Sequence, residues 1–385
     1  MSSLVSSLAS SAAEETCDVL IVGGGPAGST CARELRSAGL DVLVLDKSVF
    51  PRDKVCAGWI TPQVVEELGF DTEDYRRGRV LQPINSFVTG LGERANAAIR
   101  YDKIVSYGIR RCEFDHYLLE RSGARLRLGE TWKSMERSGD RWLVNGCISA
   151  ALVIGAGGHF CPVARFLGAH LGKEERAISA QEIEFEMNES QAARCAVAGE
   201  QPELYFCADL KGYGWCFRKG NYLNVGLGRE GNHRLAEQVQ SFAQGLVSQG
   251  KIPADLPGKF KGHAYLLYSH ATRPVIADGV MIIGDAAGLA YTQSGEGIRP
   301  AVESGMMAAA TALAVNNDYS RDRLRFYESS LRSRFGERGG TPALAMLPAA
   351  LRLSLARALM QTQWFARKVI LDRWFLHAQQ RPLYY

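Results

Sequence analysis

The sequence predicts an α/β protein in which a parallel-sheet domain carries an inserted antiparallel sheet and is followed by a helical C-terminus. Three observations support this prediction. A short apolar run ends in a glycine-rich turn near the N-terminus, alternating apolar and polar residues fill the middle of the chain, and a second apolar run ends in a Gly-Asp pair near residue 285. With 385 residues, the chain is long enough to bury the cores of two joined domains.

The first apolar run, Val19–Val22, predicts a buried parallel strand because it is short, continuous and followed by glycine. Gly23, Gly25 and Gly28 fit the G-x-G-x-x-G spacing. The first glycine permits a tight turn, the second lets a pyrophosphate approach the backbone, and the third lets the next helix pack closely on the strand. We expect that helix over Ala27–Ser37, with its free N–H groups facing the phosphates.

A second strand is expected over Asp41–Leu45, and Asp46 ends it 18 residues after Gly28. An acidic side chain at about this spacing reaches the ribose hydroxyls of a bound dinucleotide. Its charge favours NAD or FAD over NADP, whose extra phosphate it would repel. Together these elements predict a Rossmann-like dinucleotide-binding domain, without separating NAD from FAD.

The second apolar run, Gly279–Ile283, predicts another buried strand, with Gly284 and Asp285 at its carboxyl end. Ligands of open α/β sheets bind at this end, where Asp285 could accept a hydrogen bond from a ribityl hydroxyl. Taken alone, Asp285 could equally be a turn residue. A helix is expected over Ile298–Val315, directly after Gly297. Its N-terminus would stabilise the negative charge of a reduced flavin.

The middle of the chain predicts an antiparallel sheet. Glu182–Met187 and Tyr222–Leu227 alternate apolar and polar residues, as strands with one buried face do. Asn232–Gln249 predicts a helix, with Asn232 as its cap.

Three aromatic residues of this region, Tyr213, Trp215 and Phe217, also alternate and would therefore share one face of a strand. Two interpretations are open. The aromatic face could pack on the protein core, or it could form the apolar wall of a substrate pocket.

On these motifs the chain resembles the para-hydroxybenzoate hydroxylase superfamily of FAD enzymes, and within it the geranylgeranyl reductase family. The family motif P-x-x-Y-x-W-x-F-P is matched here by Tyr213, Trp215 and Phe217, whereas Leu210 and Arg218 replace its prolines. The resemblance covers about residues 17 to 340. It implies a Rossmann-like FAD-binding domain with an inserted antiparallel-sheet substrate domain.

The resemblance also implies further contacts to FAD. Cys56 and Ala57 stand in a stretch that resembles the family's cysteine-containing loop over the flavin, although buried cysteine is usually inert packing. Arg111 begins a stretch that resembles the family's Arg-x-x-Phe-Asp helix start. Its guanidinium could pair with the pyrophosphate. The alternatives are a surface arginine, or Arg110 in the same role.

The implied activity is that of an FAD-dependent oxidoreductase which reduces C=C bonds of a lipid-like isoprenoid substrate. No catalytic residue is assigned, because Tyr213, Cys56 and water all remain open as the proton donor. Gly157 stands where the superfamily usually has an aspartate, which weakens direct use of NADPH. An external electron donor is therefore expected, either a ferredoxin-like protein or NAD(P)H. The alternatives are a flavin monooxygenase or halogenase of the same superfamily, and a flavin-binding protein without reductase activity.

The expected organisation has a disordered tail, two domains that interleave along the chain, and a helical cap. The tail is residues 1–16; the FAD-binding domain is residues 17–85, 108–170 and 270–340; the substrate domain is residues 86–107 and 171–269; the cap is residues 341–385.

Composition argues against several classes of protein. The net charge of +4 is mild and no basic-aromatic pattern appears, so no nucleic-acid partner is expected. Nine dispersed cysteines without a C-x-x-C pair argue for reduced thiols, a cytoplasmic protein and no metal site. The first 16 residues lack Lys and Arg, which argues against a secretory signal, and no apolar run is long enough to span a bilayer.

The stretch from Gly340 to Tyr385 has six Lys or Arg, one acidic residue and leucines at helical spacing, followed by Trp364 and Trp374. One interpretation is a helical cap packed over the substrate domain. The other is a basic amphipathic surface that associates with an anionic membrane.

Overall fold

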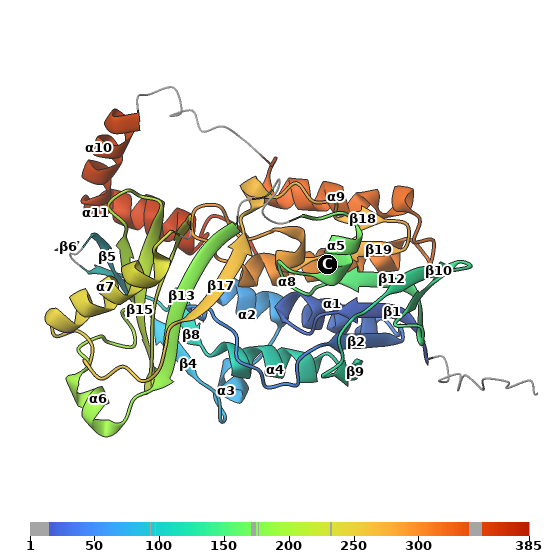
Figure 1. Ribbon diagram of the computed structural model, residues 1–385, viewed down its shortest axis with the longest axis horizontal. Helices are drawn as coiled ribbons and strands as arrows, with labels where there is room; N and C mark the ends of the chain where they lie inside the picture. Colours follow the sequence, from blue (N-terminus) through green and yellow to red (C-terminus); the bar gives the residue numbers. More distant parts are fainter. Residues whose placement is uncertain are drawn as a thin grey trace, which may run out of the picture.

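A computed structural model describes residues 15–384 apart from 93, 97, 171–174, 176, 232 and 339–348. Two sheets lie in separate lobes, with helices over both (Figure 1). The predicted α/β class is confirmed, with a parallel core and antiparallel edges in the first sheet and mostly antiparallel pairing in the second.

The first sheet has a parallel core that follows from its continuous apolar strands. Its path is β10 (Met135–Ser138), β11 (Arg141–Val144), β12 (Ile148–Gly155), β1 (Glu15–Val22), β2 (Val42–Asp46) and β9 (Arg125–Leu128). β19 (Val280–Ile282) pairs in parallel with β12, and β18 (Ile276–Ala277) pairs with β19. β1 begins two residues before the expected domain start at Cys17, and the rest of the expected tail lies outside the described residues.

Helices cover this sheet and bring its binding edge together. α1 (Pro26–Ser37) packs on α8 (Ile298–Ala314), and α4 (Arg111–Arg121) packs on α1 from another side. α9 (Arg321–Phe335) packs on α8, and the short α5 (Pro162–Phe166) follows β12. A 3₁₀ turn over Gly284–Ala287 follows β19, so the expected strand Gly279–Ile283 is shorter than predicted.

The second sheet runs β17 (Lys261–Leu266), β13 (Ala177–Glu186), β16 (Tyr222–Glu230), β15 (Gly212–Lys219), β14 (Glu203–Phe206), β5 (Ser86–Leu91) and β6 (Arg94–Ala95). β7 (Ile99–Arg100) also pairs with β5. Its pairings are antiparallel apart from β14 with β5, as the alternating pattern predicts. α6 (Glu189–Arg194) and α7 (Leu235–Ser248) belong to this lobe. The expected cap Asn232 lies outside the described residues, and α7 begins after Arg234, whose φ is 61°.

A small third sheet links the lobes, in the order β3 (Trp59–Ile60), β8 (Ser106–Ile109) and β4 (Leu81–Ile84), beside α2 (Pro62–Leu68) and α3 (Thr72–Tyr75). The exact division into two domains stays a prediction.

The C-terminal segment packs on the second sheet. It forms α10 (Ala349–Met360), α11 (Gln363–Phe365) and a π-helical stretch, Ala366–Phe375. Ile370 and Phe375 are fully buried in one apolar cluster with the aromatic residues of β15. The chain end then returns to the first lobe (Figure 1), where the Leu383 N–H donates to the Glu67 carboxyl at 3.1 Å. The described part of the segment is therefore a packed cap.

Candidate active site

A cavity of about 440 Å³ lies between the carboxyl ends of the parallel strands and the inner face of the second sheet. It brings together most of the residues that the sequence singles out. These are Gly23, Gly25, Ala27, Asp46, Cys56, Ala57, Arg111, Tyr213, Trp215, Phe217, Asp285, Gly297 and Ile298. Gly28 and Gly284 do not line the cavity and lie behind its wall.

The glycine turn between β1 and α1 has the local geometry that its spacing predicts. Gly23 has a φ of 118°, and a Cβ there would lie 2.4 Å from the Ala156 oxygen. A Cβ on Gly28 would lie 1.9 Å from the Gly23 oxygen, so this glycine allows the helix to pack against the turn. A Cβ on Gly25 would meet only the Arg52 guanidinium, at 3.5 Å. The open side of Gly25 is therefore the side where an anionic group can approach the N-terminus of α1.

Asp46 lines the cavity at the end next to the glycine turn. Its Oδ2 accepts a hydrogen bond from the Gly24 N–H and its Oδ1 accepts one from the Ser48 N–H, both at 2.8 Å. These bonds hold the carboxylate at the end of β2. Each oxygen keeps a lone pair that can accept from a ribose hydroxyl.

Arg111 lines the cavity, but its guanidinium is paired within the protein. It donates to Asp115 Oδ1 at 2.7 Å and to Oδ2 at 2.9 Å. Arg52 also reaches Asp115, at 3.2 Å, and lies beside the open side of Gly25. Arg110 does not line the cavity and instead pairs with Glu113 at 2.6 Å. The sequence motif identified Arg111 and missed Arg52, whose position only the folded loop reveals.

Asp285 lies on the turn after β19, facing the start of α8. A Cβ on Gly297 would lie 3.0 Å from the Asp285 Oδ1, so the glycine leaves room for this carboxylate. Glu296 accepts a hydrogen bond from the Arg299 N–H at 2.7 Å and thus caps α8, while burial raises the pKa of Glu296 to about 7. The N-terminus of α8, at Ile298, opens onto the cavity.

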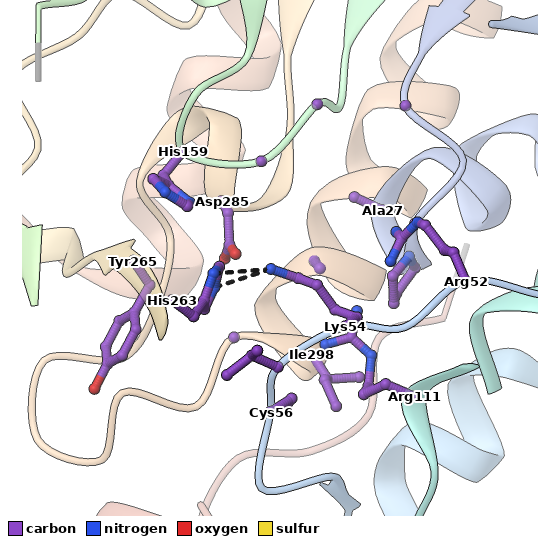
Figure 2. Close-up of a pocket in the computed structure, with 18 of the residues that line it drawn as sticks. Ala27, Arg52, Lys54, Cys56, Arg111, His159, His263, Tyr265, Asp285 and Ile298 are labelled. Carbon is purple, nitrogen blue, oxygen red and sulfur yellow. Dashed lines mark hydrogen bonds between the residues drawn. The ribbon is translucent and has the colours of Figure 1, made fainter. Parts of the chain in front are cut away.

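A cluster of basic residues that the sequence did not single out lines the middle of the cavity. Lys54 extends across it to His263, with its Nζ 2.9 Å from the Nε2 (Figure 2). Burial lowers the pKa of Lys54 to about 8 and that of His263 to about 2, so the histidine is neutral near pH 7. His159 lies next to His263, with the ring centroids 5.0 Å apart. A positive charge on Lys54 inside the cavity favours an anionic ligand.

Three polar side chains of the second sheet hold the backbone of Cys56 and Ala57. The Cys56 N–H donates to Glu182 at 2.6 Å, and its carbonyl accepts from the Asn224 amide at 3.1 Å. The Ala57 carbonyl accepts from the Lys219 ammonium at 3.0 Å. The position of the loop of residues 47–58 therefore depends on the second sheet.

Tyr213, Trp215 and Phe217 all line the cavity from one face of β15, so the expected shared face is present. The same side chains pack against the C-terminal segment: the Tyr213 ring lies 5.2 Å from that of Phe375. The aromatic face therefore packs in the core and also lines the cavity, and its role as a substrate wall stays a prediction. Space for the Trp215 indole comes from Gly226, where a Cβ would lie 2.3 Å from the Trp215 Cζ2.

The residues present fit FAD as a ligand. Helices α1 and α8 both direct their N-termini at the cavity, which suits a pyrophosphate and a reduced flavin. Asp46 lies beside the glycine turn and Asp285 beside the start of α8, so both carboxylates are available to sugar or ribityl hydroxyls.

Comparisons with known proteins agree with this geometry. The family described as "FAD binding domain" matches residues 16–338. The digeranylgeranylglycerophospholipid reductase of Methanocaldococcus jannaschii is 29% identical over 334 residues, which is 81% of this chain and 81% of that protein. The menaquinone reductase of Mycobacterium tuberculosis is 30% identical over 374 residues, 91% of this chain and 87% of that protein.

A solved structure has the same fold. A geranylgeranyl bacteriochlorophyll reductase-like protein from Thermoplasma acidophilum superimposes with a TM-score of 0.75 at 22% identity, covering 95% of this chain and all of that one. The family match and the curated relatives confirm the expected cofactor and enzyme class. This chain belongs to the FAD-binding domain family, as an FAD-dependent oxidoreductase of the geranylgeranyl reductase type.

Proposed function

We propose that this protein reduces C=C bonds of an isoprenoid chain, such as a geranylgeranyl group, with electrons from its FAD. The observation that carries the proposal is the position of the aromatic face of β15. Tyr213, Trp215 and Phe217 line the same cavity as the glycine turn and Asp285, so an apolar chain can lie beside the cofactor. Two of the proteins described above, the digeranylgeranylglycerophospholipid reductase and the geranylgeranyl bacteriochlorophyll reductase-like protein, carry a geranylgeranyl group in their names, which supports this substrate class.

In this proposal the first lobe holds FAD. The N-terminus of α1 at Gly25 and Ala27 binds the pyrophosphate, with Arg52 and Arg111 as the nearby cations. Asp46 accepts a hydrogen bond from a ribose hydroxyl.

At the flavin end of the cofactor, Asp285 accepts a hydrogen bond from a ribityl hydroxyl. Gly297 and Ile298 place the N-terminus of α8 next to the flavin ring. Cys56 and Ala57 cover the ring from the loop that the second sheet holds.

Reduced FAD supplies the hydride equivalent for such a reaction. The protein places the alkene in an apolar slot that excludes water and orients it toward the cofactor. Trp215 and Phe217 form one wall of the slot. Because Gly226 has no side chain, the Trp215 indole can lie against the backbone of the neighbouring strand.

The electron donor is proposed to be a ferredoxin-like protein, with NAD(P)H as the alternative. At position 157, a Cβ would lie 3.3 Å from both the Cys161 Cα and the Pro162 Cδ. The acidic side chain usual in the superfamily is therefore replaced by a closely packed glycine.

We also propose that the protein associates with a membrane surface, where an isoprenoid lipid resides. No helix among the described residues is long and apolar enough to cross a bilayer. However, Leu355, Leu359 and Trp364 are exposed on the C-terminal cap, next to exposed Arg367 and Lys368. Apolar insertion combined with attraction to anionic headgroups suits this surface.

An anaerobic experiment tests the reductase. FAD-loaded protein is reduced with dithionite, freed of excess reductant, and mixed with polyprenyl alcohols, diphosphates or glycerolipids. The expected result is reoxidation of the flavin together with a mass gain of two hydrogens per reduced double bond. Failure of every polyprenyl substrate to reoxidise the flavin would contradict the proposal, and substrate-coupled oxygen uptake would favour the monooxygenase or halogenase alternative.

A further inference from the structure

Glu182 is a buried carboxyl group in the cavity wall, and the function proposed above uses it only to hold the Cys56 loop. It lies on β13 with 5% of its surface exposed and lines the cavity. Its Oε1 accepts the Cys56 N–H at 2.6 Å, and its Oε2 lies 3.4 Å from the Asn224 amide nitrogen. The carboxyl is therefore held in one orientation between the Cys56 loop and the second sheet.

Glu182 also stands in the same cross-strand row as the aromatic wall. It pairs with Gly226 of β16, which in turn pairs with Trp215 of β15. A Cβ on Gly226 would lie 2.7 Å from the Glu182 Cβ and 2.3 Å from the indole. With glycine between them, the carboxyl and the indole are neighbours on the wall, so an alkene against the indole lies near the carboxyl.

The charged and titratable groups around Glu182 come from four elements. They are Glu184 on β13, Lys219 on β15, Lys261 and His263 on β17, and Lys54 and Cys56 on the loop of residues 47–58. Burial raises the pKa of Glu182 to about 7, opposed by the Cys56 N–H and the Lys219 charge. The carboxyl can therefore change its protonation state at physiological pH.

The two tyrosines beside Glu182 in the wall, Tyr213 and Tyr265, are less suitable proton donors. The Tyr213 hydroxyl donates to the Ser294 carbonyl, and burial raises the pKa of Tyr213 further above the usual phenol value. Burial also raises the pKa of Tyr265. Efficient general acids have a pKa near the working pH, which favours a carboxyl in this environment over a phenol.

We propose that Glu182 is the general acid that protonates the isoprenoid double bond. The inference rests on the reductase function proposed above. Saturation of one C=C bond adds one hydride equivalent and one proton. The O–H bond of the Glu182 carboxyl breaks as a C–H bond forms at the alkene carbon that does not receive the hydride. The carboxylate that remains takes a proton from water before the next turnover.

Glu182→Gln tests this role with little change of shape, because the amide oxygen can still accept the Cys56 N–H. In anaerobic stopped-flow experiments, reoxidation of the reduced flavin by a polyprenyl substrate should slow by about 10²–10⁴-fold. Binding of FAD should stay within about twofold of the wild type, since the hydrogen bond to the loop remains. Glu182→Asp keeps the acid and should recover part of the rate.

Glu186→Gln is the matched control. Glu186 lies on the same strand, does not line the cavity, and accepts a hydrogen bond from the Tyr222 hydroxyl at 3.0 Å. In Glu186→Gln the reduced flavin should be reoxidised at the same rate as in the wild type. A Glu182→Gln variant that reoxidises at the wild-type rate would overturn the inference while leaving the reductase function intact.

The pH dependence provides a second test. The acid must be protonated to act, so the wild-type rate should be constant well below pH 7 and fall about tenfold per pH unit above it. Glu182→Gln should be slow and show no such step. An identical step in both proteins would assign the titration to another group and contradict the proposal.

An infrared titration tests the carboxyl without any substrate. Oxidised, FAD-loaded wild type and Glu186→Gln should show carboxylic-acid absorption that disappears as the pH rises through neutrality. Because Glu296 also has a pKa of about 7, Glu182→Gln should lose only the Glu182 component, seen as a band in the wild-type-minus-variant difference spectrum. Absence of this difference band would refute Glu182 as the acid, whatever the substrate. If the band is present but no polyprenyl substrate reacts, the proposed function fails, and with it the reaction assigned to Glu182.

Discussion

The Trp215 indole donates its N–H to the Asn224 Oδ1 at 2.7 Å, and this bond is the first link between the aromatic face of β15 and the loop of residues 47–58. The Asn224 amide in turn donates to the Cys56 carbonyl at 3.1 Å. One fully buried asparagine therefore connects an aromatic residue of the wall with the loop of residues 47–58. Because the bonds are short and shielded from water, displacement of the indole should be transmitted to Cys56.

We predict that Asn224→Leu destabilises the protein and alters the flavin. The substitution leaves the buried Trp215 N–H and Cys56 carbonyl without their partner, which should cost about 1–3 kcal/mol for each group. Urea unfolding measures the loss of stability, and the flavin absorption spectrum reports the displaced loop. Asn221→Leu, at an exposed turn of the same hairpin, should leave both measurements near wild type.

Two substitutions in one glycine motif should have different effects. Gly25→Val should fold, because its side chain meets only Arg52, but should lose at least about tenfold in FAD affinity since it occupies the approach to α1. Gly28→Val should fail to fold, because its Cβ would lie 1.9 Å from the Gly23 oxygen. Circular dichroism and FAD titration separate the two outcomes. Full FAD occupancy in Gly25→Val would mean that the pyrophosphate binds elsewhere.

Asp285→Ala should weaken FAD binding without unfolding the protein. Loss of one hydrogen bond to a charged acceptor costs about 1.5–3 kcal/mol, or roughly ten- to a hundredfold in affinity. Asp285→Asn keeps an acceptor oxygen and should lose less. Fluorescence titration of the apoprotein with FAD measures both values, and unchanged affinity in Asp285→Ala would make this carboxylate a turn residue alone.

Trp364→Ser should reduce binding to anionic vesicles with little effect on stability. This indole is 68% exposed on the C-terminal cap, so its removal creates no cavity. Phe326→Ser, on α9 with 62% exposure, is the matched control and should bind vesicles as the wild type does. Co-sedimentation with phosphatidylserine vesicles at low and high salt is the measurement. If the wild type does not bind vesicles at low salt, the proposed membrane association is wrong.

Elements with strong local signals were predicted closely. The helix expected over Ala27–Ser37 is α1 (Pro26–Ser37), and the helix expected from Ile298 begins there. Local rules suffice for these elements because glycine spacing and continuous apolar runs act over a few residues. The C-terminal segment was harder. A basic amphipathic pattern is the same on a membrane surface as on a protein core, and only tertiary contacts, such as that of Phe375 with Tyr213, show that the described part of this segment is packed.

The sequence alone determined that the first domain binds a dinucleotide, because Gly23, Gly28 and Asp46 act through backbone geometry and short spacings that the local chain dictates. The tertiary structure decided which side chains share the cavity. The sequence motifs assign no role to the side chains of Glu182, Asn224 and Lys54. These side chains reach Cys56 and His263 only because the second sheet packs against the loop of residues 47–58. Contacts between residues more than a hundred positions apart depend on the whole fold, and burial then changes the chemistry of Glu182 and Lys54.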